Sequence, residues 1–536
     1  MRALHRCCGV VVGKIRDTGL LQDELLIFEQ GGKGRKGYSL PRWDVEEVEV
    51  QNFLPPGLLR KELKGFPQLS EVDVVRHFTR LSQWNYGVDS GLYPLGSCTM
   101  KYNPKVNEEI ARMGGFSKIH PCTPEELSQG ILKLMFELQG FLAEITGMDH
   151  VTLQPAAGAH GELTGMMMVR ACLQARGEKR KKVLVPDTAH GTNCSTSSIA
   201  SYQMIEIKSN ENGVIPPEKV NELMDEEVAA IMVTNPNTLG LFEEHLDKIA
   251  EIVHGKGGFV YCDGANLNAL MGMVKLGDLG VDVVHINLHK TFSTPHGGGG
   301  PGAGPVAVKK ELSPYLPIPV IEKQGDSYRL NDDQPHSIGK VKTFYGNFGV
   351  LIKAYAYILS MGAEGLKKAS EMAVLNANYL MKRLKGHYHL PYDRPCMHEC
   401  VFTDRIQERY HVSTLDIAKR LIDYGFHPPT IYFPLVVKGA LMMEPTETES
   451  KESIDRFIET MIIVAEEAEE DPDLLRQAPQ KVKVRRLDEV LAARKPKLKW
   501  TAPSPRRGEG QGEGETPNVK SQIPNNDQLS NSKSEN

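Results

Sequence analysis

Short apolar runs alternate with segments of helical periodicity between residues 145 and 310. The periodic segments predict helices, among them 161–177 and 246–254, and the apolar runs predict buried strands. These strands are expected at 183–185, 228–234, 259–262 and 283–288. Strands that alternate with helices are typical of an α/β fold, with a mostly parallel sheet flanked by helices. In such sheets, ligands bind beyond the carboxyl ends of the strands.

After residue 350 the pattern changes to longer helical stretches separated by single strands. We expect helices at 351–384, 414–424 and 450–470, with strands at 399–403 and 440–443. This alternation predicts a second, smaller α/β domain. The predicted parts of the chain are an N-terminal extension (1–60), a large domain (61–350), a small domain (351–475), and a basic segment with a disordered tail (476–536).

The composition indicates a folded, slightly acidic protein. Apolar residues make up 40% of the 536 residues and charged residues 24%, so most of the chain can form a core. The net charge of −5 excludes a globally basic nucleic-acid-binding protein. The basic run at 481–499 is typical of a solvated surface, and we predict no nucleic-acid binding. From about residue 503 the chain lacks large apolar residues, which predicts disorder.

The nine cysteines are scattered, which argues against a disulfide framework and favours a reducing cytoplasm. Cys396, His398 and Cys400 lie close together, but no second ligand pair follows with zinc-finger spacing, and we predict no metal. No apolar run reaches the roughly 18 residues of a membrane span. The basic N-terminus has only a short apolar run, which argues against a secretory signal and leaves a transit peptide or an upstream start site open.

Residues able to bind an anionic cofactor follow several predicted strands. Residues 154–161 (QPAAGAHG) precede a helix, and small residues there expose backbone N–H groups to a phosphate. His190 comes shortly after the strand at 183–185, and Asp263 comes directly after the strand at 259–262. Each of these features alone is also consistent with a purely structural role.

Lys290 stands at the end of the fourth predicted strand and is followed by a glycine-rich loop. The loop contains matches to G-x-G-x-x-G, but prolines interrupt any following helix and no P-loop lysine is present. A lysine at this position is suited to form a Schiff base. The order of phosphate loop, His190, Asp263 and Lys290 is that of fold-type-I enzymes dependent on pyridoxal 5′-phosphate (PLP). We therefore predict a PLP site.

Longer motifs extend this interpretation. The segment 287–292 (NLHKTF), followed by PHGGGGPG at 295–302, resembles the lysine region of the glycine cleavage system P-protein family, glycine dehydrogenase (decarboxylating). Further similar segments are YPLGSCTMKYNP (93–104), AHGTN (189–193) and TNPNTLG (234–240). The resemblance runs from about residue 38 to 470. It covers only the lysine-bearing C-terminal half of a full-length P-protein, which corresponds to the second subunit of the split form.

The resemblance implies a fold-type-I PLP-dependent transferase fold and a specific reaction. Glycine would be decarboxylated, and the aminomethyl group would pass to the lipoyl arm of H-protein, with PLP supplying the chemistry. The implied partners are lipoylated H-protein and glycine dehydrogenase subunit 1, the other half of the P-protein. The family also implies an α2β2 heterotetramer.

The same resemblance implies a role for each candidate residue. Lys290 would carry the cofactor, Asp263 would pair with the pyridine nitrogen, and His190 would stack on the ring. The loop at 97–101 would line the substrate side. The remaining expected cofactor contacts are Ala157, Gly158 and His289 at the phosphate, Ala265 behind the ring, and Asn266 near the phenolic oxygen.

Two other functions fit parts of the pattern. The chain could be another fold-type-I PLP enzyme, such as an amino-acid decarboxylase, an aldolase or a desulfurase. It could also be a non-catalytic scaffold with the same fold. The presence of both Asp263 and Lys290 argues against the scaffold, because a silent copy has no chemical need for the pair.

Overall fold

The structure is a computed structural model that describes residues 24–60, 63, 65–297, 302–482 and 484–500. Contacts divide the chain into two units, one formed by Met1–Asn85 with Leu487–Asn536 and the other by Tyr86–Arg486. In the first unit, helix α1 (Glu71–Ser82) is capped by Ser70 and carries Arg80, which forms an ion pair with Glu24. The same unit contains the short helix α14 (Glu489–Arg494).

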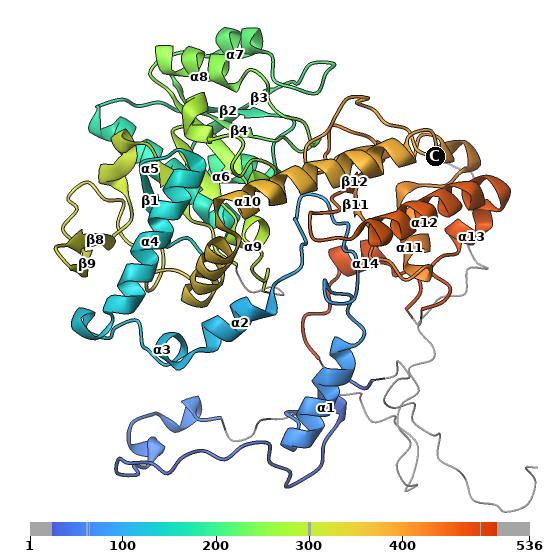
Figure 1. Ribbon diagram of the computed structural model, residues 1–536. Coiled ribbons are helices and arrows are strands. Elements are labelled where there is room, and N and C mark those ends of the chain that lie inside the picture. Colours follow the sequence, from blue (N-terminus) through green and yellow to red (C-terminus); the bar gives the residue numbers. More distant parts are fainter. Residues whose placement is uncertain (1–23, 61–62, 64, 298–301, 483, 501–536) are drawn as a thin grey trace, which may run out of the picture. The chain divides into compact units, whose positions relative to one another are not determined.

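A seven-stranded mixed sheet forms the centre of the second unit (Figure 1). Its order is β1-β7-β6-β5-β4-β2-β3. Neighbouring strands from β6 to β3 are parallel, whereas β7 is antiparallel to both β1 and β6. The strands are β1 (His150–Thr152), β2 (Lys182–Pro186), β3 (Gln203–Ile207), β4 (Val228–Thr234), β5 (Phe259–Gly264), β6 (Val283–Ile286) and β7 (Val306–Val308).

Alternate residues of the central strands enter separate hydrophobic cores. In β4, Ile231 and Val233 belong to one core, while Ala230 and Met232 belong to another. Successive side chains of a strand point to opposite faces, so the sheet is buried on both sides. The helices of this region are α2 (Lys105–Arg112), α3 (Gly114–Ser117), α4 (Gln129–Thr146), α5 (Gly158–Ala175), α6 (Gly191–Ile199), α7 (Pro217–Leu223), α8 (Leu246–Gly255) and α9 (Leu288–Thr291).

A long helix, α10 (Phe348–Leu384), connects this sheet to a smaller α/β region (Figure 1). The smaller region has a three-stranded antiparallel sheet of order β10-β12-β11 and its own core. A separate hairpin, β8 (Val320–Gln324) and β9 (Ser327–Asn331), precedes α10. The remaining elements are β10 (Cys400–Thr403), α11 (Thr414–Asp423), β11 (Thr430–Ile431), β12 (Ala440–Met443), α12 (Lys451–Glu470) and α13 (Pro472–Arg476).

The predicted α/β architecture is confirmed, and the ends of two predicted strands differ by two residues from those observed. The strand expected at 259–262 continues to Gly264, so Asp263 lies inside β5 and does not follow it. The strand expected at 283–288 ends at Ile286, and Lys290 lies in the one-turn helix α9. Asn287 begins that turn because its carbonyl accepts hydrogen bonds from the N–H groups of Lys290 and Thr291. The predictions for the extreme N-terminus and the disordered tail concern residues outside the described ranges. None of the helices in the described ranges combines the length and apolar character needed to cross a membrane.

The loop after β4 encloses a buried carboxyl group, which gives a testable pH dependence. Glu243 accepts hydrogen bonds from the Ile215 N–H (2.9 Å) and from the Asn237 amide (2.8 Å). Burial raises the pKa of Glu243 to about 7. Because this pKa is above the unfolded value, its stabilising contribution is fully present below about pH 4.5 and is lost as the pH rises through about 7.

We expect Glu243→Gln to flatten the pH dependence of stability. The free energy of unfolding of the parent should fall by roughly 3 kcal/mol more than that of the variant between about pH 5 and about pH 8. Urea unfolding of both proteins at the two pH values measures this difference. Parallel pH dependences in the two proteins would contradict the assignment.

Candidate active site

Asp263 lies at the carboxyl end of β5 and is almost fully buried. Its Oδ2 atom accepts a hydrogen bond from the Asn193 amide (3.0 Å) and lies 2.9 Å from His190 Nδ1, while its Oδ1 atom accepts the Ala265 N–H (2.9 Å). Burial alone would raise the pKa of Asp263, but the imidazoles of His285 and His190 hold it below its ordinary value. Asp263 is therefore a carboxylate at neutral pH.

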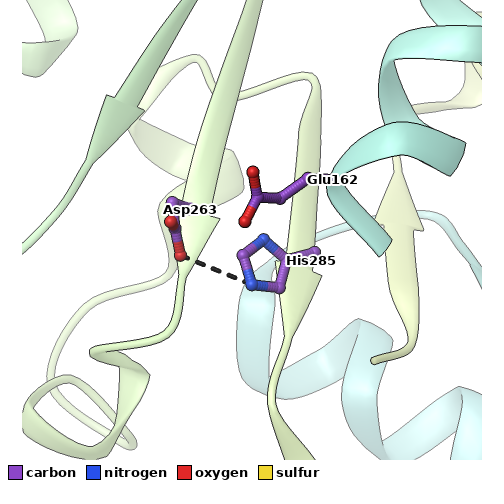
Figure 2. Close-up of side chains that lie close together, drawn as sticks. All are labelled: Glu162, Asp263 and His285. Carbon is purple, nitrogen blue, oxygen red and sulfur yellow. Dashed lines mark ion pairs between the residues drawn. The ribbon is translucent and has the colours of Figure 1, made fainter. Parts of the chain in front are cut away.

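Glu162, on α5, faces Asp263 and His285 (Figure 2). His285 is the register partner of Asp263 on the neighbouring strand β6, and its Nε2 atom lies 3.4 Å from Asp263 Oδ1. Burial, followed by the charge of Asp263, raises the pKa of Glu162 to about 8, and burial lowers the pKa of His285 to about 4. At neutral pH the cluster thus holds a protonated Glu162, a neutral His285 and one ionised carboxylate, Asp263.

His190 connects this acid to a distant loop. It is the N-cap residue of α6, its Nδ1 atom lies 2.9 Å from Asp263 Oδ2, and its Nε2 atom lies 2.7 Å from Ser97 Oγ. The ring is nearly parallel to that of Phe433, with an interplanar angle of 8° and a centroid distance of 6.1 Å. Both ring nitrogens are engaged, so the orientation of the imidazole is fixed.

Lys290 also contacts the loop that contains Ser97. Its Nζ atom donates a hydrogen bond to the Ser97 carbonyl oxygen at 2.7 Å. Ser97 therefore contacts both Lys290 and His190, and through His190 it is connected to Asp263. The structure thus places Lys290 and the predicted ring-stacking His190 in contact with one serine, and Asp263 lies behind His190.

The predicted phosphate residues meet at the N-terminus of α5. Ala157 is the N-cap residue of this 18-residue helix, and no side chain caps it. A Cβ atom on Gly158 would stand 2.5 Å from Asn287, so glycine permits this close approach. His289 Nδ1 lies 3.3 Å from the Ala303 nitrogen, next to Gly304, which packs against Ala157. Free backbone N–H groups at a helix N-terminus suit a phosphate.

Asn266 follows Ala265 at the end of β5 and is completely buried. Its amide nitrogen donates to the Pro236 carbonyl (2.9 Å), whereas its Oδ1 atom has no hydrogen-bond partner among the described residues. The Oδ1 atoms of Asn193 and Asn287 also lack partners there. Buried polar atoms are normally satisfied, so these three amides fit a site built around a polar group.

Together, a lysine, a buried carboxylate, a fixed imidazole and an uncapped helix N-terminus match the functional groups of PLP. Solved structures place the fold in the same class. The chain is similar to a glycine decarboxylase (P-protein) crystallised in inhibitor-bound form, with a TM-score of 0.66, 22% identity, and coverage of 77% of this chain and 94% of that chain. It is also similar to a NifS-like protein (TM-score 0.55, 15% identity, 70% and 99% coverage). The protein therefore has the fold of the fold-type-I PLP-dependent enzymes.

Sequence relatives define the family. The "Glycine cleavage system P-protein" family matches residues 44–329, and "Glycine dehydrogenase, C-terminal domain" matches residues 369–482. A "Probable glycine dehydrogenase (decarboxylating) subunit 2" of Caldanaerobacter subterraneus subsp. tengcongensis is 60% identical, with 89% of this chain and 98% of the relative covered. A Bacillus cereus relative with the same name is 57% identical (90% and 99% covered). The chain belongs to the glycine cleavage system P-protein family, as its sequence motifs predicted.

Several residues of this site carry no signal in the sequence by themselves. Glu162 lies inside a helix and His285 inside a strand, so neither follows a strand end. Ser97 belongs to the segment expected to line the substrate side, but its contacts with Lys290 and His190 could not be foreseen. Asp263 and His285 are neighbours because β5 and β6 pair in parallel, and this register is visible only in the structure.

Proposed function

We propose that this chain is the lysine-bearing subunit of a glycine decarboxylase of the glycine cleavage system. In this reaction glycine loses carbon dioxide, and its aminomethyl group passes to the lipoyl arm of H-protein. The observation that supports it most directly is the convergence of Lys290, His190 and Asp263 in a chain of the P-protein family. A desulfurase-like activity is the alternative, since a NifS-like protein shares the fold.

The proposed roles follow from the chemistry of each group. PLP, when bound, supplies an electron sink for the electron pair that decarboxylation leaves on the substrate carbon. Lys290 Nζ would bind the cofactor covalently and carry protons at that atom. Asp263, which is ionised and buried, would hold a proton on the pyridine nitrogen, and His190, which Asp263 orients, would stack on the ring. The neutral Glu162 adds no second negative charge at neutral pH.

The remaining contacts orient the cofactor. The backbone at Ala157 and Gly158, with His289 beside it, would hold the phosphate. Ala265 would pack behind the ring, and the Asn266 amide would approach the phenolic oxygen. Burial lowers the pKa of His289 to about 3, so the imidazole would contribute as a neutral hydrogen-bonding group. The division into a large domain and a small domain near residue 350 stays a prediction.

The relatives are named as a second subunit, so a partner subunit is implied. We propose that the partner is glycine dehydrogenase subunit 1, that the two chains form an α2β2 heterotetramer, and that lipoylated H-protein delivers the acceptor. A location in the cytoplasm is consistent with the scattered cysteines. Each of the seven cysteines for which the structure gives a state is a free thiol.

Glycine-dependent exchange of labelled bicarbonate tests the proposed function. We expect exchange when the chain, PLP, subunit 1 and lipoylated H-protein are combined, and none when H-protein or subunit 1 is omitted. The same mixture should release no sulfide from cysteine. Cofactor bound to Lys290 without glycine exchange, but with sulfide release, would reject the decarboxylase in favour of a desulfurase.

A further inference from the structure

Two buried glutamates and one half-buried glutamate of the small α/β region hold the loop that touches Lys290. Glu399 Oε2 accepts the Ser97 N–H (2.7 Å), and Glu444 Oε2 accepts the Thr99 N–H (2.9 Å). Glu447 then accepts a hydrogen bond from the Lys101 ammonium group (2.6 Å). The acids thus bind every second residue of the loop, at positions 97, 99 and 101. They lie 302 to 346 residues further along the chain.

The loop backbone is strained where the first two acids hold it. Ser97 has a φ of 66° and Thr99 a φ of 44°. Both values lie in the left-handed region, which residues other than glycine rarely adopt. Such a conformation persists only where the surroundings enforce it. The two carboxyl groups provide that enforcement, since each accepts a hydrogen bond from the backbone N–H group of a strained residue.

The strained loop positions the cofactor residues directly. The Ser97 carbonyl accepts the hydrogen bond from Lys290 Nζ, and the Ser97 hydroxyl lies 2.7 Å from His190 Nε2. A rotation of the Ser97 backbone would move both groups at once. Glu399 is therefore one residue away from the two side chains that would bind and face the cofactor, and Glu444 holds the same loop two residues further on, at Thr99.

We propose that Glu399 and Glu444 are positioning residues of the cofactor site, which hold Ser97 in the orientation that fixes Lys290 and His190. The proposal rests on the proposed PLP function of Lys290. It assigns the small α/β region a part in the cofactor site of the large sheet.

The environment of the two acids supports a specific role. Both are completely buried, and their Oε1 atoms have no hydrogen-bond partner in the described part of the chain. Burying two carboxyl groups with unpartnered oxygens reduces the stability of the fold. Proteins accept such a cost mainly at functional sites. Burial raises the pKa of both groups, that of Glu444 to about 7, while the Lys290 ammonium acts in the opposite direction on both.

The test compares Glu399→Ala and Glu444→Ala with Glu399→Gln in the full-length chain, purified with subunit 1. The readouts are cofactor affinity, the fraction of chain linked to PLP at Lys290 after borohydride reduction, and the midpoint of the pH titration of cofactor absorbance. Both alanine variants should lose about tenfold or more in affinity and shift the midpoint, because the buried acceptor of a backbone N–H group is lost. Glu399→Gln should stay within about threefold of the parent, because its amide oxygen still accepts the Ser97 N–H.

Asp404→Asn is the matched control. Asp404 follows the strand β10 that Glu399 precedes, and it also accepts a backbone N–H, that of Thr414 (2.8 Å). We expect this variant to lower the melting temperature without moving either cofactor readout. Equal shifts in the control and in the alanine variants, or parental readouts in folded alanine variants, would overturn the proposal.

Glu399→Asp covers the case in which an alanine variant does not fold. It keeps a carboxyl group in the small α/β region but is one methylene shorter, so the acceptor is withdrawn from the Ser97 N–H. It must reproduce the shifted titration, and a parental titration in the folded variant would reject the positioning role. None of these readouts requires glycine turnover. A parent that links PLP but exchanges no bicarbonate rejects only the glycine function, whereas a parent without linked PLP rejects both proposals.

Discussion

Lys290→Ala is expected to abolish the covalent link to PLP and to reduce glycine–bicarbonate exchange by more than about 1000-fold. The substitution removes the proposed nucleophile for the cofactor and the group proposed to carry protons beside it. It also removes the hydrogen bond from Nζ to the Ser97 carbonyl. Borohydride reduction followed by peptide mass analysis measures the link, and the exchange assay measures the activity.

Lys309→Ala is the control for this experiment. Lys309 also donates a hydrogen bond of 2.7 Å to a backbone carbonyl, that of Gly147, but it follows β7 away from the candidate site. We expect this variant to keep the covalent link and the exchange activity. If Lys290→Ala retained exchange above a few per cent, the assignment of Lys290 as the cofactor lysine would be wrong.

Asp263→Asn is expected to keep the cofactor bound but to slow decarboxylation on the order of 100- to 1000-fold. An amide cannot hold the pyridine nitrogen protonated, so the electron sink is weakened. The substitution also changes the contacts of the Oδ2 position, which now faces both the Asn193 amide and His190 Nδ1. Either the oxygen or the NH2 group of the new amide would occupy that position. The exchange rate at saturating PLP, measured beside cofactor affinity, separates the two effects.

Asp282→Asn provides the comparison for Asp263. Asp282 contacts a histidine too, with Oδ2 2.8 Å from His254 Nε2, and it accepts the Val260 N–H near the opposite end of β5. This variant should lose some stability and keep its exchange rate. A fully active Asp263→Asn enzyme would contradict the role of Asp263 as the partner of the pyridine nitrogen.

The parts of the site that could be predicted are those at strand ends. Apolar strands run toward the edge of the sheet where ligands bind, and polar residues at or shortly after their carboxyl ends are candidates for contact with a ligand, which is why His190 and Asp263 could be chosen. The expected strand extends past the end of β6 because Leu288 resumes the apolar pattern after Asn287, whereas the backbone turns there into α9. Local periodicity does not distinguish the last residue of a strand from the first residue of a buried helical turn.

The supporting residues could not be predicted, because their roles depend on contacts distant in sequence. Glu399 and Glu444 flank strands of the small α/β region and have no motif of their own, yet they hold residues 97 and 99. Glu162 resembles any helical glutamate until the fold places it against Asp263. A single sequence shows which residues can do chemistry more readily than which residues hold them in place.

Helix α10 has a consequence for how the chain unfolds. Its first half supplies Leu351 and Ile358 to the core of the large sheet, and its second half supplies Leu380 and Leu384 to the core of the smaller region. Between the halves, Gly362 adopts a φ of 62° and a ψ of −178°, a conformation essentially limited to glycine. Because the two halves of α10 are joined directly at this kink and complete different cores, loss of either core leaves half of α10 without packing. The two regions should therefore melt as one cooperative unit.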